Sequence, residues 1–112
     1  MKKTNPFVET LLKKLKPHGP ITARAMFGGY GIYYGDVIFA LIAENRLYFR
    51  ADDLNRKDYE AYDSQPFVYQ GMRKPVTMPY MNLPDEILEN SKELPRWINK
   101  AVDSSLRNKK KK

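Results

Sequence analysis

Few residues in this sequence could carry out chemistry. His18 is the single histidine, and the 112 residues include no cysteine. A catalytic histidine needs a nucleophile to deprotonate or a carboxylate to orient it, and no motif places either beside His18. His18 stands between Pro17 and Gly19, where we expect a surface side chain. The sequence therefore predicts no catalytic residue and no enzymatic activity.

Metal and cofactor sites are equally hard to assemble. Without cysteine, and with one histidine, only carboxylates remain as candidate ligands. The acidic pairs Asp52–Asp53 and Asp85–Glu86 stand at expected helix starts, where the helix dipole favours them. The run Gly28-Gly29-Tyr30-Gly31 leads into a strand, so it indicates a bend or bulge rather than a phosphate loop. We expect no metal and no cofactor.

The net charge of +7 is concentrated at the ends of the chain. Arg107 and the lysines at 109–112 carry five of these charges, and Lys2 and Lys3 carry the other two, so residues 4–106 are close to neutral. The sequence predicts a folded domain over 1–106 and a basic, disordered tail over 107–112. Such a tail can attract polyanions weakly by counterion release, or it can simply be a solvated end.

The pattern of apolar residues predicts an α+β domain. A first helix begins at Pro6, four antiparallel strands follow over residues 21–51, and a short helix reaches about Tyr62. Two strands over residues 67–80 and two further helices complete the chain. The order α-β-β-β-β-α-β-β-α-α predicts two layers, an antiparallel sheet of about five or six strands with helices on one face.

Individual strands can be placed from their side chains. Val37–Ile42 is apolar on both faces and is expected at the centre of the sheet. Leu47 and Phe49 alternate with polar neighbours and are expected to face the core. Pro75 and Pro79 predict that the last strand is an edge or a bulged strand, because proline cannot donate to a ladder.

The sequence shows no route to a membrane. Thr4-Asn5-Pro6 interrupts the place where a signal peptide needs its apolar stretch. The longest apolar run, residues 37–43, is far shorter than the roughly 20 residues that cross a bilayer. Together with the absence of cysteine, this predicts a cytoplasmic protein without membrane contact.

Tyrosine and arginine recur through the predicted sheet, and two interpretations stay open. A shared face would resemble a stacking platform for single-stranded nucleic acid. Alternatively, the tyrosines pack at the rims of the sheet with their hydroxyls in contact with water. The near-neutral charge of residues 4–106 favours this second interpretation. The residues that could share the face are Tyr30, Tyr33, Tyr34, Tyr48, Tyr69, Arg24, Arg46, Arg50 and Arg73. The candidate nucleic-acid contacts are Tyr48, Arg50, Arg73, Lys109, Lys110, Lys111 and Lys112.

The most distinctive stretch is Thr-Ala-Arg-Ala-Met-Phe-Gly-Gly-Tyr-Gly-Ile-Tyr at residues 22–33. With further segments, it resembles the N-terminal domain of the TfoX/Sxy family of bacterial competence regulators. Those segments are Phe39-Ala-Leu-Ile-Ala, Arg46-Leu-Tyr-Phe-Arg, Pro66-Phe-Val-Tyr, Lys74-Pro-Val-Thr-Met-Pro-Tyr and Leu83-Pro-Asp-Glu-Ile-Leu. The resemblance covers about residues 6–106.

The resemblance implies a role in gene regulation without enzymatic activity. Full-length members are understood to assist the cyclic-AMP receptor protein at promoters of DNA-uptake genes, and they carry a second, C-terminal helical domain. This chain stops at residue 112 and is expected to be a single-domain member. We therefore expect a protein-interaction module with a protein partner, such as the cyclic-AMP receptor protein. Direct nucleic-acid binding is the alternative, and a homodimer through a sheet edge or a helix face also stays open.

The segment 24–31 is the candidate contact region. A glycine-flanked bend can present side chains that a regular strand would bury. We expect a charged anchor at Arg24, apolar contacts at Met26, Phe27 and Tyr30, and the bend at Gly28, Gly29 and Gly31. The alternative is that the same residues are purely architectural.

Overall fold

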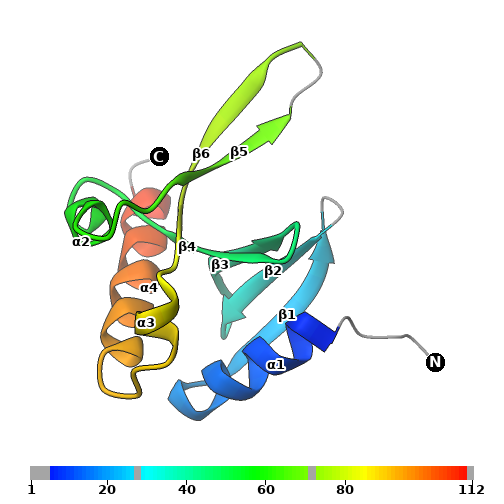
Figure 1. Ribbon diagram of the computed structural model, residues 1–112, viewed down its shortest axis with the longest axis vertical. Coiled ribbons are helices and arrows are strands. Elements are labelled where there is room, and N and C mark those ends of the chain that lie inside the picture. Colours follow the sequence, from blue (N-terminus) through cyan, green and yellow to red (C-terminus); the bar gives the residue numbers. More distant parts are fainter. Residues whose placement is uncertain (1–5, 27–28, 71–72, 111–112) are drawn as a thin grey trace.

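The structure is a computed structural model that describes residues 6–26, 29–70 and 73–110. In these ranges the chain forms helices and one antiparallel sheet (Figure 1). The helices are α1 (Pro6–Leu15), the 3-10 helix η1 (Lys16–His18), α2 (Arg56–Glu60), α3 (Asp85–Leu88) and α4 (Leu94–Lys110). The strands are β1 (Ile21–Met26), β2 (Gly29–Tyr34), β3 (Val37–Ala43), β4 (Arg46–Arg50), β5 (Pro66–Gln70) and β6 (Pro75–Asn82).

The sheet has six strands in the order β1-β2-β3-β4-β6-β5, and every neighbouring pair is antiparallel. The predicted class and order of elements are therefore confirmed. Strand β3 lies between β2 and β4, as its apolar residues on both faces predict.

The turns that join the first strands follow from their residues. Gly35 has φ 60°, which glycine adopts without strain, and it is the first residue of the β2–β3 turn. Glu44 and Asn45 have φ 52° and 61° in the β3–β4 turn. Positive φ at both positions fits the tight hairpin turns that match the twist of paired strands.

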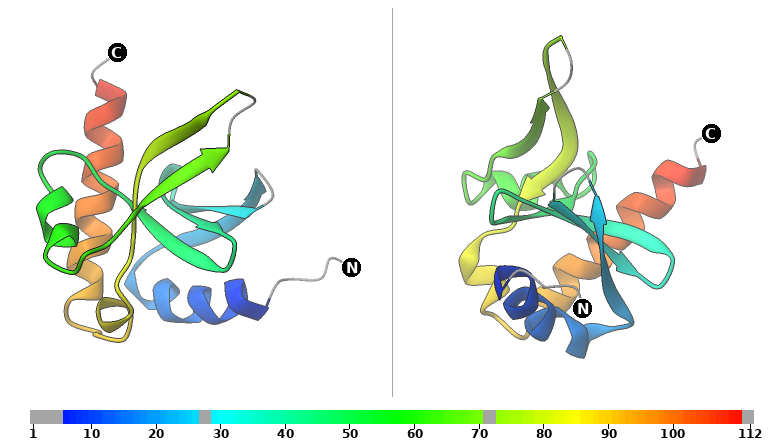
Figure 2. Two further views of the ribbon diagram at one scale, coloured as in Figure 1. Left: turned by 45° about the horizontal axis from the view of Figure 1, so that its top comes forward. Right: turned by 90° about the vertical axis from the view of Figure 1, so that its right-hand side faces the viewer.

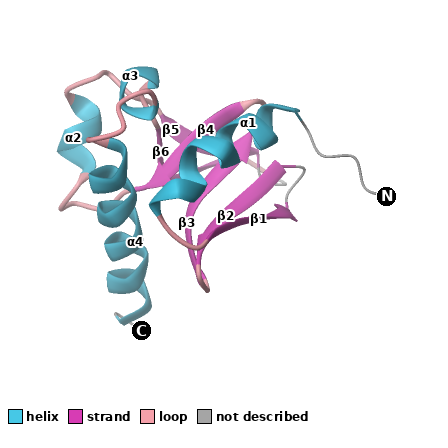
Figure 3. Ribbon diagram, turned by 90° about the horizontal axis from the view of Figure 1, so that it is seen from below, coloured by secondary structure: helices cyan, strands magenta, loops and turns pink. Residues whose placement is uncertain are grey.

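The main core lies between the sheet and the helices. Figures 1 and 3 show the helices gathered on one side of the sheet. Leu47 and Phe49 face this core as predicted, at 5% and 0% exposed. Phe39 packs against Phe49 with ring centroids 5.4 Å apart and an interplanar angle of 75°, an edge-to-face contact. Helix α4 supplies apolar side chains such as Ile98 from the other side.

Strands β5 and β6 form a hairpin that projects from the body (Figures 1 and 2). Strand β6 pairs with β4 only at residues 80–82, and beyond that point it pairs with β5 alone. Strand β6 is an inner strand only at residues 80–82, where β4 and β5 flank it; at residues 75–77 it pairs with β5 alone among the described strands and has a free edge, so the predicted choice of an edge or a bulged strand is confirmed. The irregular register near Pro66 agrees with the predicted bulge. Pro75 lies in the part of β6 that no longer faces β4. Pro79 is the last residue on that side, where its carbonyl accepts the Ala51 N–H, and neither proline has to donate to β5.

The last helix continues past residue 106, where the sequence places the end of the folded domain. Helix α4 reaches Lys110, and Arg107 lies inside it. Asn90 caps the turn that leads into this helix, since its Oδ1 accepts hydrogen bonds from the backbone N–H groups of Lys92 and Glu93, each at 3.0 Å. None of the helices in the described ranges is long and apolar enough to span a bilayer.

Candidate interaction surface

The side of the sheet that faces away from the helices carries a second apolar cluster. Leu41, Tyr48 and Tyr80 are 6%, 8% and 4% exposed, although no described helix covers them. Phe67 reaches across from β5, and its ring centroid lies 5.1 Å from that of Tyr48. The half-buried side chains that pack on this cluster are Met26, Ile38, Ala43, Phe67 and Met78. We call this side of the sheet the open face.

The open face continues onto the projecting hairpin. Tyr69 lies directly opposite Val76 in the register of β5 and β6. Each is two residues from a member of the cluster, Phe67 and Met78 respectively, so strand alternation places both on the same face. Tyr69 is 41% and Val76 44% exposed. The apolar surface therefore runs from the body of the sheet towards the end of the hairpin.

Two arginines lie over aromatic rings on the open face. The Arg24 guanidinium carbon is 4.9 Å from the centroid of the Tyr33 ring, and that of Arg50 is 5.6 Å from the Tyr80 ring. Burial raises the pKa of the Tyr80 hydroxyl, and the nearby Arg50 guanidinium offsets part of that increase. Tyr80 is thus neutral near pH 7, and the open face carries positive charge at Arg24 and Arg50.

Charge is divided between the sheet and the rest of the fold. The six strands contain three arginines, Arg24, Arg46 and Arg50, and no aspartate or glutamate. The acidic residues stand in the helices, turns and loops instead. No acidic residue occurs from Ser64 to Pro84, which includes the whole β5–β6 hairpin. Residues 4–106 are therefore near neutral in total, although the strands of the sheet carry only positive charge.

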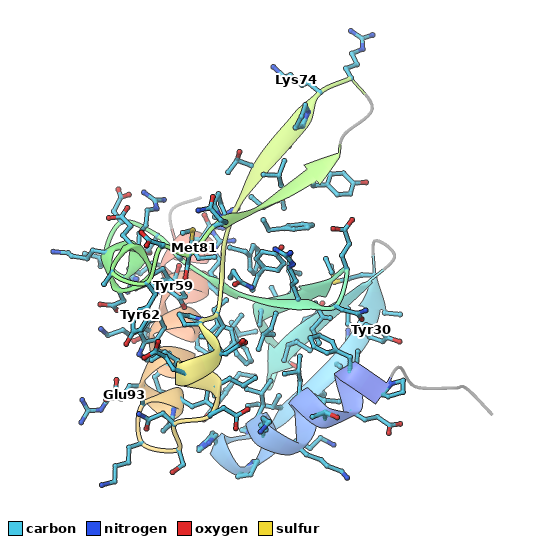
Figure 4. The ribbon with its side chains drawn as sticks, viewed as in Figure 1. Tyr30, Tyr59, Tyr62, Lys74, Met81 and Glu93 are labelled. Atoms are coloured by element: carbon cyan, nitrogen blue, oxygen red, sulfur yellow. The ribbon has the colours of Figure 1, made fainter. Side chains whose placement is uncertain are left out.

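The predicted contact segment is divided between the two faces. Arg24 is exposed on the open face, and Met26 packs against the cluster there. Tyr30 packs against the main core, on the side of the sheet where α1 lies (Figure 4). Phe27 and Gly28 lie outside the described residues. The segment therefore contributes two described side chains, Arg24 and Met26, to the open face.

The two described glycines of this segment lie in close contact with their neighbours. A Cβ on Gly29 would collide with the backbone carbonyl oxygen of Ile42, and one on Gly31 would collide with the Met26 sulfur. Both glycines thus allow β2 to lie close to its neighbours, which is an architectural role.

We expect Gly29→Ala to lower the free energy of unfolding by about 2 kcal/mol, because the backbone at Ile42 must shift. Urea denaturation followed by circular dichroism measures this change. Gly31→Ala is the matched control, and it should cost less because the flexible Met26 side chain can move aside. An equal cost at both positions would contradict this account of Gly29.

The predicted tyrosine platform is only partly assembled. Tyr33, Tyr48 and Tyr69 belong to the open face, whereas Tyr30 and Tyr34 pack against the main core. The prediction that all five share a face is wrong for these two, because alternation along β2 sends Tyr30 and Tyr34 to the side opposite Tyr33.

The candidate nucleic-acid residues are separated in space. Tyr48 and Arg50 lie together on the open face, and Arg73 lies beside the turn of the hairpin. Lys109 and Lys110 are at the end of α4, which packs on the other face of the sheet. Lys111 and Lys112 lie outside the described residues.

The sequence-based prediction misses much of the apolar cluster. Its missed members include Ile38, Leu41, Phe67, Met78 and Tyr80. The signal that could have found three of them is strand alternation. Phe67 is two residues from Tyr69 and therefore shares its face, whereas Met78 and Tyr80 lie on the face opposite the prolines of β6.

A cavity of about 370 Å³ lies at the end of α4, and four of the charged side chains that line it form two ion pairs. Arg107 Nε and Nη2 donate to Asp52 Oδ2 and Oδ1, each at 2.8 Å. Arg56 pairs with Asp53 at 3.0 Å. The described residues contain no group of three or more histidine or acidic side chains that could hold a metal ion.

Arg107 holds the pKa of Asp52 at about 2, below the ordinary 3.8. A lowered pKa stabilises the fold above the unfolded value, and the stabilisation is lost as the pH falls through the folded value. We expect Asp52→Asn to cost about 1 kcal/mol at neutral pH, reduced because the pair is partly exposed. The free energies of unfolding of the parent and the Asp52→Asn variant should converge as the pH falls from 3.8 to about 2. A difference that persists below that interval would contradict this role of Asp52.

The fold and its surface define a two-layer α+β domain with helices on one face and an uncovered apolar face on the other. The chain belongs to the TfoX N-terminal domain family, whose model matches residues 13–105. It is 25% identical over 91 residues to Protein Sxy of Escherichia coli, a match that covers 81% of this chain and 44% of that protein. The resemblance seen in the sequence is confirmed, and the chain spans less than half the length of this relative.

Proposed function

We propose that this domain is a non-enzymatic protein-interaction module of the TfoX N-terminal type that acts in transcription or competence regulation. The observation that carries the proposal is the open face, an apolar cluster that no described helix covers. Clusters of this kind that continue into exposed apolar side chains mark binding surfaces.

The composition of the open face suits a protein partner. Aromatic residues, methionine and arginine are enriched in protein interfaces, and the open face combines Tyr48, Tyr80, Met78 and Arg24. Buried Leu41 lies beneath these groups, so part of the surface is already packed before a partner arrives. A preorganised surface reduces the entropy lost on binding.

The partner that we propose belongs to the transcription machinery, with the cyclic-AMP receptor protein as the first candidate. Within the segment 24–31 we place Arg24 and Met26 in the interface. Tyr30 supports this interface from the core side of β2. The glycines of the segment shape the strand behind these side chains.

Isothermal titration of the chain with the cyclic-AMP receptor protein tests this proposal. We expect Arg24→Glu to weaken binding by about 10-fold or more, because it reverses a charge on a basic face. Lys13→Glu is the matched control, since it makes the same charge change at an exposed position on α1. Equal affinity of the Arg24→Glu variant and the parent would contradict the proposed surface, and absence of binding would contradict the proposed partner.

A second candidate, direct nucleic-acid binding, is favoured by one observation. The strands carry arginines over aromatic rings and no carboxylate, which suits stacking and phosphate contact. Fluorescence anisotropy with labelled single-stranded and duplex DNA tests it at low and physiological salt. The truncated form should end at residue 108, because a form that ends at residue 106 would lack Arg107 and with it the Arg107–Asp52 pair. Binding by both forms that persists at physiological salt would support this candidate over a protein partner.

A further inference from the structure

The outer edge of β5 has no neighbouring strand in the described sheet. Strand β5 is the last in the order β1-β2-β3-β4-β6-β5. An edge strand presents unpaired backbone N–H and C=O groups, and an extended segment of another chain can pair with them. Strand β1 is the opposite edge, but none of the large exposed apolar side chains in the described ranges lies on it.

Prolines hinder strand addition on the other free side of the hairpin. The carbonyl of Pro79 accepts the N–H of Ala51 at 3.0 Å, so the backbone of Pro79 turns away from β5. The backbone groups of successive residues in a strand point to opposite sides, so those of Pro75 and Thr77 also point away from β5. Of these three positions, only Thr77 has an N–H to donate. An added strand would therefore find one donor there over five residues of β6.

Strand β5 offers its backbone without that obstacle. Val76 lies between Pro75 and Thr77, so its backbone N–H and C=O groups point towards β5. Those of Tyr69, which is opposite Val76, point towards β6. The backbone groups of Val68 and Gln70 then turn outward, to the free edge. Val68 is also 41% exposed, an apolar side chain beside an open backbone edge.

The charge near this edge selects the kind of segment that fits. Arg73 and Lys74 are exposed beside the hairpin turn, and Figure 4 shows Lys74 at its far end. No carboxylate from Ser64 to Pro84 neutralises them within the hairpin. An acidic segment would meet complementary charge there, whereas a basic one would be repelled.

We propose that β5 binds an extended, acidic segment of a partner protein as an added strand. The added strand would continue the open face, so that its apolar side chains lie beside Tyr69 while its carboxylates reach Arg73 and Lys74. This inference rests on the proposed function, because it specifies how a protein partner engages the same surface.

Selection of peptides from a displayed random library against the full chain tests the inference. We expect the enriched peptides to be acidic and extended. Val68→Pro removes the outward N–H and should weaken their binding by about 10-fold or more, whereas Val68→Thr keeps that N–H and should change binding by less than about 3-fold. The double variant Arg73→Glu/Lys74→Glu should also lose about 10-fold or more.

Hydrogen exchange in the parent chain provides a second readout that does not depend on how Val68→Pro folds. Binding of an enriched peptide should slow exchange of the Val68 and Gln70 amides. Unchanged exchange at both amides, or peptides that bind Val68→Pro as well as the parent, would overturn strand addition. If those peptides nevertheless bind the Arg24→Glu variant more weakly than the parent, the open face is still the protein-binding surface, and only the proposed strand addition is wrong.

Other occupants of the edge would give different results. Slow exchange at Val68 and Gln70 without peptide, together with a dimeric mass by light scattering, would assign the edge to a second copy and overturn the proposal. Slower exchange of these amides with single-stranded DNA, but with none of the peptides, would also overturn the proposal. A library without enriched peptides, while Arg24 still controls binding of the cyclic-AMP receptor protein, would reject strand addition alone.

Discussion

Phe39→Ala is expected to remove about 4 kcal/mol from the free energy of unfolding. Phe39 is 0% exposed in the central strand β3, and its ring packs edge to face on Phe49. Truncation loses both the burial of the ring and the aromatic contact, and it leaves a cavity that the neighbouring strands and α4 cannot close. Domains of this size are stable by about 5–15 kcal/mol, so the loss is a large share of the total. Urea denaturation with an unchanged m-value would measure it.

The same substitution on the open face provides the control. Phe67 is half-buried and packs on Tyr48 at the base of the hairpin. Phe67→Ala should cost about 1–2 kcal/mol, because the ring keeps part of its exposure to water in the folded state. A cost equal to that of Phe39→Ala would show that the open face is a second structural core rather than a surface.

The double variant Arg24→Glu/Val76→Asp is expected to weaken binding of the protein partner by about 100-fold or more. Both positions are exposed, and they lie far apart along the open face, on β1 and on the hairpin. One change reverses a charge, and the other buries a carboxylate against an apolar partner surface. Effects at well-separated positions add in free energy, so two losses of about 10-fold multiply. Isothermal titration with the cyclic-AMP receptor protein measures the result.

The control for this double variant carries the same charge changes elsewhere. Lys13→Glu/Leu54→Asp alters an exposed lysine of α1 and an apolar side chain that is 68% exposed in the loop before α2. Both double variants should melt at nearly the parent temperature. If the control weakened binding as much as Arg24→Glu/Val76→Asp, the effect would come from net charge and not from the open face.

The local sequence predicts most of the fold because its signals agree with one another. The apolar run of β3, the turn residue Gly35 and the alternation of Leu47 with its neighbours each define an element without reference to distant residues. The apolar face of the last helix likewise predicts a buried Trp97, which is 8% exposed. These features depend on neighbours within a few positions along the chain.

The parts that the sequence does not predict depend on contacts between distant residues. Helix α4 extends past residue 106, and Arg107 within that extension pairs with Asp52, 55 positions earlier. The position of Arg24 over the Tyr33 ring depends on the register of β1 with β2. Whether β6 is an inner or an edge strand depends on which strands join it, and here β4 flanks it only at residues 80–82. No local pattern contains that information.

Site-specific photocross-linking in bacterial cells tests the central proposal, that the open face contacts a protein. The photoreactive residue p-benzoylphenylalanine would replace Val76 on the open face in one variant and Leu54 in the other, since both side chains are well exposed. We predict a discrete protein adduct from position 76 that is lost when Arg24→Glu is added, and no such adduct from position 54. Adducts from position 54 alone, or an adduct at position 76 that consists of nucleic acid, would contradict the proposal.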